Sequence, residues 1–189
     1  MALSISGICI LFARKGGRAY DGEPVNQIQH ALQTAARAED DGAAPALVAA
    51  ALLHDLGHLL NDQGESPTLR GVDDLHQYAA LPFLRALFAD DVLKPIQLHV
   101  DAKRFLCATR DGYFEALSSD SKRSLVLQGG AFAPDQAAAF IAQDYAEDAV
   151  RLRLWDDLAK VEAAVTPPLA HFVAVLEAAQ RFEFAPTAT

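Results

Sequence analysis

Apolar residues recur at intervals of three and four along most of the chain, which is the spacing of an amphipathic helix. Residues 25–41 show it well, with Ile28, Leu32, Ala35 and Ala36 on one face and Gly42 as a stop signal after them. β-branched residues are few and no long alternating run occurs, so strands are not expected. The pattern predicts an all-α helical bundle, with helices over residues 5–13, 25–41, 45–60, 74–87, 91–109, 134–161 and 168–182.

Two segments depart from this simple pattern. Residues 45–60 are apolar almost all round, which predicts the central buried helix of the bundle. Residues 118–130, SSDSKRSLVLQGG, are polar, then briefly apolar, then glycine-rich. That composition predicts a loop, and its serines and lysine make it a candidate for binding a ligand.

Composition limits the classes of partner that the chain is expected to bind. A chain of 189 residues is long enough for one domain with a substantial core, and a net charge of −9 without a basic stripe argues against a nucleic-acid partner. Cys9 and Cys107 have neither metal-type nor redox-type spacing. The apolar residues 5–13 lack the flanks of a signal peptide and are too short to span a bilayer. We therefore expect a cytoplasmic protein with free thiols and no membrane partner.

The chemistry centres on His54-Asp55-Leu56-Gly57-His58, inside the most apolar helix predicted. Burying an unpaired carboxylate costs several kcal/mol, roughly, unless something compensates its charge. A bound metal ion would do so. His54 and His58 are four positions apart and share a helix face, whereas Asp55 projects about 100° away from His54.

The other histidines strengthen this interpretation. A single histidine on an apolar helix is more often a core residue than a ligand, but four predicted helices carry His30, His54-Asp55, His76 and His99. The long predicted helix adds Asp156-Asp157. Imidazole and carboxylate ligands suit Fe, Mn or Zn, and the lack of neighbouring thiolates argues against a zinc finger or an iron–sulfur cluster.

In the order His30, His54-Asp55 and Asp156, these residues resemble the H…HD…D pattern of the HD-domain superfamily. The resemblance covers residues 20–160. We expect the whole chain, residues 1–189, to form a single HD domain. Within that superfamily the chain is most similar to the mixed-valent di-iron oxygenases of organophosphonate catabolism. The similarity is carried by YDGEPVNQ…HALQTA (20–35), HDLGH (54–58), LQGG (127–130) and LWDDLAK (154–160).

The resemblance implies two iron ions in the Fe(II)/Fe(III) state, with O₂ as co-substrate. Asp55 would bridge the metals, one completed by His30, His54 and Asp156, the other by His76 and His99. Asp156 is preferred to Asp157 because a lysine, Lys160, follows it by four positions. Tyr20 and Glu23 would form a mobile lid. His58 and Lys103 would face the phosphonate, together with Ser121 or Ser124 and Gln128.

The implied activity is an oxygenase that cleaves the C–P bond of 1-hydroxy-2-aminoethylphosphonate or its N-trimethyl analogue. The products would be glycine or glycine betaine, with inorganic phosphate. An aromatic box for a trimethylammonium group has four candidate rings, those of Tyr20, Tyr78, Phe105 and Tyr113.

Two other classes of protein use similar residues. One is an HD-domain phosphohydrolase that releases phosphate from a nucleotide or phosphomonoester with a metal-bound hydroxide. The other is a non-catalytic metal-dependent binding module. The Tyr20…Glu23 segment and the pair His76 and His99 favour the oxygenase. A small-molecule partner is expected, and the chain is expected to be a monomer or a weak dimer.

Overall fold

The protein is a bundle of helices, which confirms the all-α prediction. The structure, a computed structural model, describes residues 2–20, 22–61 and 67–181. Position 21 of the YDGEP motif, part of the expected loop after residue 60 and the last residue of the predicted helix 168–182 lie outside these ranges. No described helix combines the length and the apolar composition needed to cross a membrane.

The helices follow one another closely along the chain. In order they are α1 Ile5–Lys15, α2 Gln27–Asp40, α3 Pro45–Leu53, α4 Leu56–Leu60, the 3₁₀ turn η1 Pro67–Arg70, α5 His76–Ala79, α6 Leu81–Leu84, α7 Asp90–Thr109, α8 Tyr113–Ala116, α9 Ser119–Leu127, α10 Pro134–Ile141, α11 Ala146–Leu158 and α12 Leu169–Ala178. Among the described residues the only β-pairing is an isolated bridge between Ala19 and Asn26.

Local sequence explains several helix starts. Asn26 and Gln29 form a capping box that starts α2, and Ser118 caps α9 by accepting from the N–H of Ser121. Pro45 occupies the first turn of α3, where its missing N–H costs nothing. These caps fix the entry points of two helices that carry candidate site residues.

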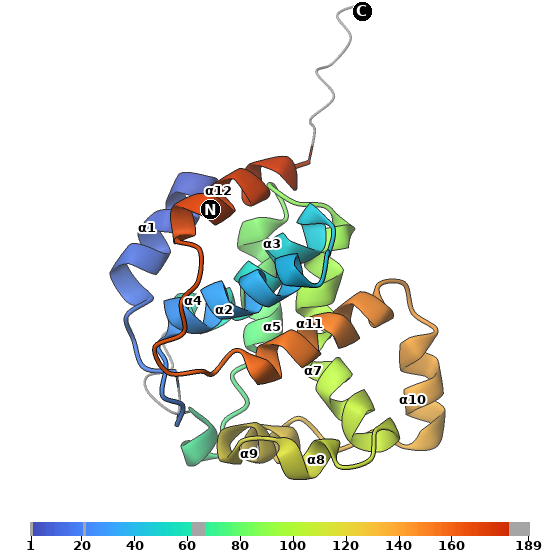
Figure 1. Ribbon diagram of the computed structural model, residues 1–189. Coiled ribbons are helices and arrows are strands. Elements are labelled where there is room, and N and C mark those ends of the chain that lie inside the picture. Colours follow the sequence, from blue (N-terminus) through green and yellow to red (C-terminus); the bar gives the residue numbers. More distant parts are fainter. Residues whose placement is uncertain (1, 21, 62–66, 182–189) are drawn as a thin grey trace, which may run out of the picture.

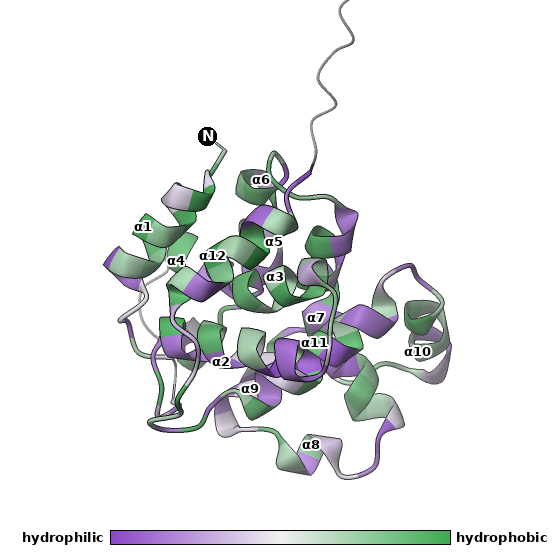
Figure 2. Ribbon diagram, turned by 45° about the horizontal axis from the view of Figure 1, so that its top comes forward, coloured by the Kyte–Doolittle hydropathy of each residue, from purple (hydrophilic) through white to green (hydrophobic). Residues whose placement is uncertain are grey.

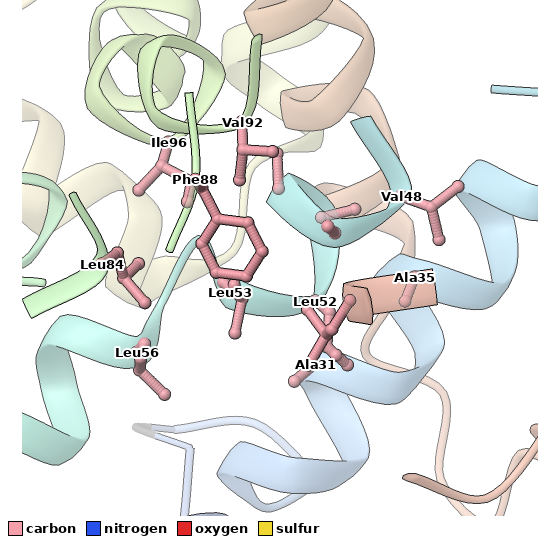
Figure 3. Packing of buried hydrophobic residues seen from close by; sticks show 14 of the residues in the cluster. Ala31, Ala35, Val48, Leu52, Leu53, Leu56, Leu84, Phe88, Val92 and Ile96 are labelled. Carbon is pink, nitrogen blue, oxygen red and sulfur yellow. The ribbon is translucent and has the colours of Figure 1, made fainter. Parts of the chain in front are cut away.

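The core is built around α3. Every residue of α3 from Leu47 to Leu53 is buried, and the helix contacts α2, α7, α11 and α12. Figure 2 shows α3 green in the middle of the bundle, between helices with mixed faces. The fully buried ring of Phe88 lies near Leu53, Leu84 and Ile96 (Figure 3). Helix α11 packs along α7, and α8 and α9 lie together at one end of the bundle (Figure 1).

Five predicted segments are corrected by the structure. Residues 45–60 are two helices, α3 and α4, because the backbone leaves helical geometry at Asp55. Residues 74–87 likewise divide into α5 and α6. The expected loop 118–130 contains the helix α9, and the single helix predicted over residues 134–161 divides into α10 and α11. The last helix ends at Ala178 rather than at residue 182.

The ring of His54 bonds back into α3 just before the break at Asp55. The Nδ1 of His54 lies 2.9 Å from the carbonyl oxygen of Ala51, the acceptor that a continuing helix would offer to the N–H of Asp55. Because a carbonyl only accepts, His54 donates this bond. Helix α3 ends at Leu53 and α4 begins at Leu56, with Asp55 between them in a non-helical conformation.

Candidate metal centre

Asp55 lies between two groups of imidazoles, and its two carboxylate oxygens face different groups. Oδ2 is 3.3 Å from Nε2 of His54 and 3.5 Å from Nε2 of His30. Oδ1 is 3.5 Å from Nε2 of His76 and 3.7 Å from Nε2 of His99. Burial alone would raise the pKa of Asp55, but the nearby imidazoles of His54, His58 and His76 favour its ionised form and hold that pKa well below its usual range. The carboxylate is therefore ionised and offers one oxygen to each side.

All four imidazoles use Nδ1 to donate to an oxygen. His30 donates to Ala159 O over 3.0 Å and His99 to Ile96 O over 2.7 Å. His54 donates to Ala51 O and His76 to the Asp74 carboxylate. These bonds set the tautomer, so each neutral ring carries its lone pair on Nε2.

The Nε2 atoms converge in pairs. Nε2 of His30 lies 3.2 Å from Nε2 of His54, and Nε2 of His76 lies 3.0 Å from Nε2 of His99. With both protons on Nδ1, neither member of a pair can donate to the other, so two lone pairs face each other. A cation placed among them would relieve that repulsion. The donor set therefore fits a metal ion on each side of Asp55.

The first group is completed by Asp156. Its Oδ1 is 3.3 Å from Nε2 of His30 and is buried without a hydrogen-bond donor, whereas Oδ2 forms a 2.8 Å ion pair with Nη1 of Arg153. The neighbouring Asp157 instead pairs with Arg153 and with the hydroxyl of Tyr113. The structure thus brings Asp156, and not Asp157, against His30, and leaves one carboxylate oxygen free for a metal.

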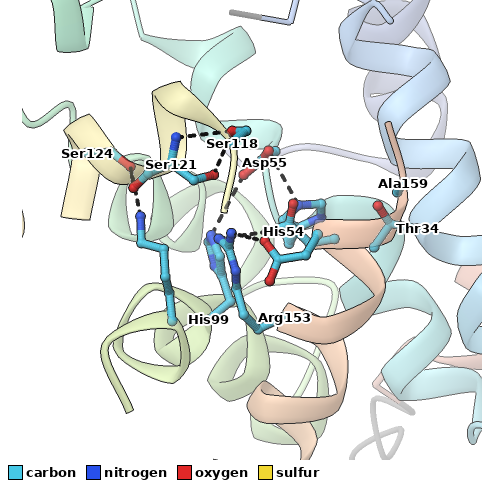
Figure 4. Close-up of polar contacts among 12 residues, drawn as sticks. Thr34, His54, Asp55, His99, Ser118, Ser121, Ser124, Arg153 and Ala159 are labelled. Atoms are coloured by element: carbon cyan, nitrogen blue, oxygen red, sulfur yellow. Dashed lines mark hydrogen bonds and ion pairs between the residues drawn. The ribbon is translucent and has the colours of Figure 1, made fainter. Parts of the chain in front are cut away.

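The second group is Asp55, His76 and His99, whose ligand atoms lie within 4.8 Å of one another, as do those of His30, His54 and Asp156. Figure 4 shows His99, from α7, directed toward Asp55, which lies with His54 in the turn between α3 and α4. Burial, together with the charges of His76 and His54, holds the pKa of His99 well below its usual range. A neutral imidazole is the form that binds a metal. The nitrogen and oxygen donors suit iron, manganese or zinc.

A cavity opens beside the second group, and one wall of it offers donors to an anion. Lys103, on α7 one turn after His99, is only 2% exposed and donates from Nζ to Ser124 Oγ over 2.8 Å. Gln128 also lines this wall, and its buried Oε1 has no partner. The predicted anion-facing residues that line the cavity are His58, Lys103, Ser121, Ser124 and Gln128.

The two predicted lid residues occupy different places. Tyr20 lines the cavity, donates its hydroxyl to Asp55 Oδ2 over 2.9 Å and stacks on His30 with ring centroids 4.1 Å apart. Glu23 does not line the cavity; its carboxylate lies 3.5 Å from Nζ of Lys160. The structure therefore brings Tyr20 to the candidate centre and holds Glu23 outside it, paired with a cation.

Sequence reasoning missed two residues that the structure places at the centre. Arg153 is buried, lines the cavity and pairs with both Asp156 and Asp157. Its position three and four residues before these carboxylates is a helical ion-pair spacing that could have identified it. Asp74, two residues before His76, accepts from two imidazoles. Sequence offered no signal for that role, because it depends on where His58 lies.

If Lys103 faces a phosphonate, as the sequence predicts, binding of that anion should depend on pH. Burial, with the charge of Arg153, lowers the pKa of Lys103 to about 7. Above that pH the amine is neutral, so we expect affinity for a phosphonate dianion to fall, by at most about tenfold per pH unit. The measurement is the Kd of methylphosphonate between about pH 6 and 9, compared with Lys103→Arg, which stays charged throughout. A constant ratio of the two Kd values would contradict the assignment.

Comparison with known proteins gives named relatives over most of the chain. Hydroxymethylphosphonate dioxygenase of Gimesia maris is 40% identical over 157 residues, which cover 82% of this chain and 78% of that protein. The glycine-betaine-forming [1-hydroxy-2-(trimethylamino)ethyl]phosphonate dioxygenase of Leisingera caerulea is 34% identical over 88% of this chain and 85% of that protein. Uncharacterized protein L432 of Acanthamoeba polyphaga mimivirus is 28% identical over 89% of this chain and 78% of that protein. No protein-family model matches the chain, so the HD-domain assignment stays a prediction.

Proposed function

The chain belongs to the phosphonate dioxygenase family, and from that membership we propose that it is an oxidoreductase that cleaves the C–P bond of a hydroxyphosphonate with O₂. The C–P bond and the C–H bond of the hydroxyl-bearing carbon break. That carbon leaves as a carboxylate and phosphorus as inorganic phosphate; both atoms of O₂ enter the products and one proton is released. The observation that carries this proposal is the pair of ligand groups that share Asp55 beside a cationic wall.

We propose the following roles for the residues at the centre. His30, His54 and Asp156 would hold one iron, His76 and His99 the other, and Asp55 would bridge them. When bound, a mixed-valent iron pair would supply Lewis acidity toward the substrate hydroxyl and electrons for O₂. Lys103 and Ser124 bind the phosphonate, with Ser121 and Gln128 beside them, and His58 faces it from the other wall. Tyr20 covers the bridge and must give way when substrate enters.

The aromatic rings that line the cavity limit which substituent the substrate carbon can carry. Of the four aromatic candidates for a trimethylammonium box, only Tyr20 lines the cavity within the described part of the chain. Tyr78 is 44% exposed, Phe105 packs on Phe140 and Tyr113 bonds to Asp157. Residues 62–66 carry no aromatic side chain. A small substituent, hydrogen or aminomethyl, therefore fits this cavity better than a trimethylammonio group.

Substrate choice can be measured directly. We expect kcat/KM to be higher for hydroxymethylphosphonate and 1-hydroxy-2-aminoethylphosphonate than for the trimethylated analogue, by about tenfold or more, since one to two kcal/mol of cation–π attraction is missing. The assay is phosphate release under O₂ with each substrate in turn. A preference for the trimethylated substrate would contradict the proposed substituent.

Oxygen dependence separates this function from the phosphohydrolase that shares its ligands. Protein reconstituted anaerobically with iron should release phosphate from a hydroxyphosphonate only after O₂ is admitted, with one O₂ consumed per phosphate. Phosphate release from a phosphomonoester without O₂, or with Mg²⁺ alone, would show that the protein is a phosphohydrolase and not an oxygenase. The protein is proposed to act in the cytoplasm on this small molecule, as a monomer or weak dimer.

A further inference from the structure

We propose that Asp74 is a positioning residue whose single carboxylate fixes both a metal ligand and the substrate-facing imidazole. Oδ1 lies 2.7 Å from Nδ1 of His76, and Oδ2 lies 2.6 Å from Nδ1 of His58. The carboxylate thus ties together two residues with different proposed tasks. The metal half of this inference stands on geometry alone, whereas the phosphonate half rests on the proposed function.

The two imidazoles form one unit. The rings of His58 and His76 stack with centroids 4.1 Å apart and planes 23° from parallel. Nε2 of each ring then faces Oδ1 of Asp55, at 3.7 Å for His58 and 3.5 Å for His76. Because a carboxylate only accepts, both rings keep their proton on Nδ1, and rotation of either ring would break its bond to Asp74.

The backbone holds Asp74 in place for this task. Its carbonyl accepts from Nδ2 of Asn61 over 3.0 Å, and its Oδ1 also accepts from the N–H of His76 over 3.3 Å. Leu75 has a left-handed backbone, φ 51°, which leaves Leu75 exposed while Asp74 and His76 on either side of it are buried. A conformation that is costly for leucine is retained where it turns both neighbours inward.

The adjacent carboxylate provides a matched control. Asp73 also lines the cavity, but it accepts a weak hydrogen bond of 3.4 Å from the N–H of Leu75 and contacts neither imidazole of the pair. Asp73→Asn therefore removes a charge at nearly the same place without releasing an imidazole. Asp74→Asn keeps the size of the side chain, but its amide has one oxygen that can accept a hydrogen bond, whereas the carboxylate uses two, one for His58 and one for His76.

The experiment measures metal and phosphonate binding separately. In anaerobic equilibrium dialysis with Fe(II), Asp74→Asn should weaken one of two sites by about 10- to 100-fold and leave the other unchanged. With Fe(II) then added to saturate both sites, affinity for methylphosphonate should fall about tenfold, since a charge-assisted hydrogen bond no longer orients His58. Asp73→Asn should match the wild type in iron binding and should not weaken methylphosphonate binding, since it removes a negative charge from the lining of the cavity. His58→Ala should weaken methylphosphonate binding and leave both iron sites unchanged.

The inference would be overturned if the Asp74→Asn protein had the same iron affinities, or the same methylphosphonate affinity, as the Asp73→Asn protein. If Asp74→Asn does not fold, nitrogen NMR of the wild-type imidazoles decides instead: His58 and His76 should both be Nδ1-protonated, and an Nε2-protonated tautomer for either would overturn it. The dialysis needs no substrate. Failure to release phosphate from any hydroxyphosphonate would thus defeat the proposed function and leave the metal readout intact.

Discussion

Asp55→Asn should abolish O₂-dependent phosphate release and leave the chain unable to hold two metals. An asparagine offers one carbonyl oxygen, so its amide nitrogen would face the imidazoles on the other side of the site, where no metal can bind it. Since a Lewis-acidic metal contributes several kcal/mol to such a reaction, activity should fall by at least about a thousandfold. The measurements are initial rates of phosphate release and the metal content of the purified variant.

Asp101→Asn is the control for this change. Asp101 is a half-buried carboxylate on α7 that pairs with Arg104 away from the cavity. Its loss should leave both rate and metal content near those of the wild type. An Asp55→Asn protein that retains two metals, or keeps a rate within tenfold of the wild type, would contradict a bridging role for Asp55.

Gly57→Ala should damage both folding and the second metal group. A Cβ at Gly57 would lie 2.1 Å from the carbonyl oxygen of His76 and 2.7 Å from its carbonyl carbon. These are backbone atoms, so α4 and the start of α5 must move apart. We expect a loss of about 3 kcal/mol in the free energy of unfolding, a drop of about 10 °C in Tm, and one metal per chain instead of two.

Gly7→Ala is the matched glycine substitution. A Cβ at Gly7, inside α1, would meet only Leu3 Cδ2 and Ser4 Oγ at 3.4 Å, which is an ordinary contact. Alanine stabilises a helix interior relative to glycine by about 0.5–1 kcal/mol, so Tm should rise slightly and both metals should remain. A Gly57→Ala protein with two metals and an unchanged Tm would show that the two segments do not touch as described.

The sequence allowed the helical fold to be predicted from its periodicity. The side chains of the two candidate metal groups were predicted from conspicuous histidines on apolar faces together with the resemblance to the HD-domain superfamily. It did not reveal the break at Asp55. The residues on both sides of that break are equally apolar, and no glycine or proline occupies positions 54–56 to mark it. Periodicity does not register a backbone turn of that kind.

The remaining differences come partly from local signals and partly from tertiary contacts. The segment starting at Ser118 was predicted to be a loop on its polar composition, although Ser118 is a good N-cap for α9. The role of Arg153 depends on how α11 packs against α7. The pairing of Glu23 with Lys160 joins residues far apart in the sequence. The cap at Ser118 and the spacing of Arg153 to its carboxylates are local signals, whereas the pairing of Glu23 with Lys160 needs the relative placement of two segments.

Anomalous diffraction at the iron edge, from crystals of anaerobically reconstituted protein, would test the dinuclear centre most directly. Two peaks should appear, one on each side of the Asp55 carboxylate, the first among His30, His54 and Asp156 and the second against His76 and His99. The expected separation is about 3.5–4 Å, as in other two-metal sites. A single peak, or two peaks that Asp55 does not bridge, would contradict the central claim.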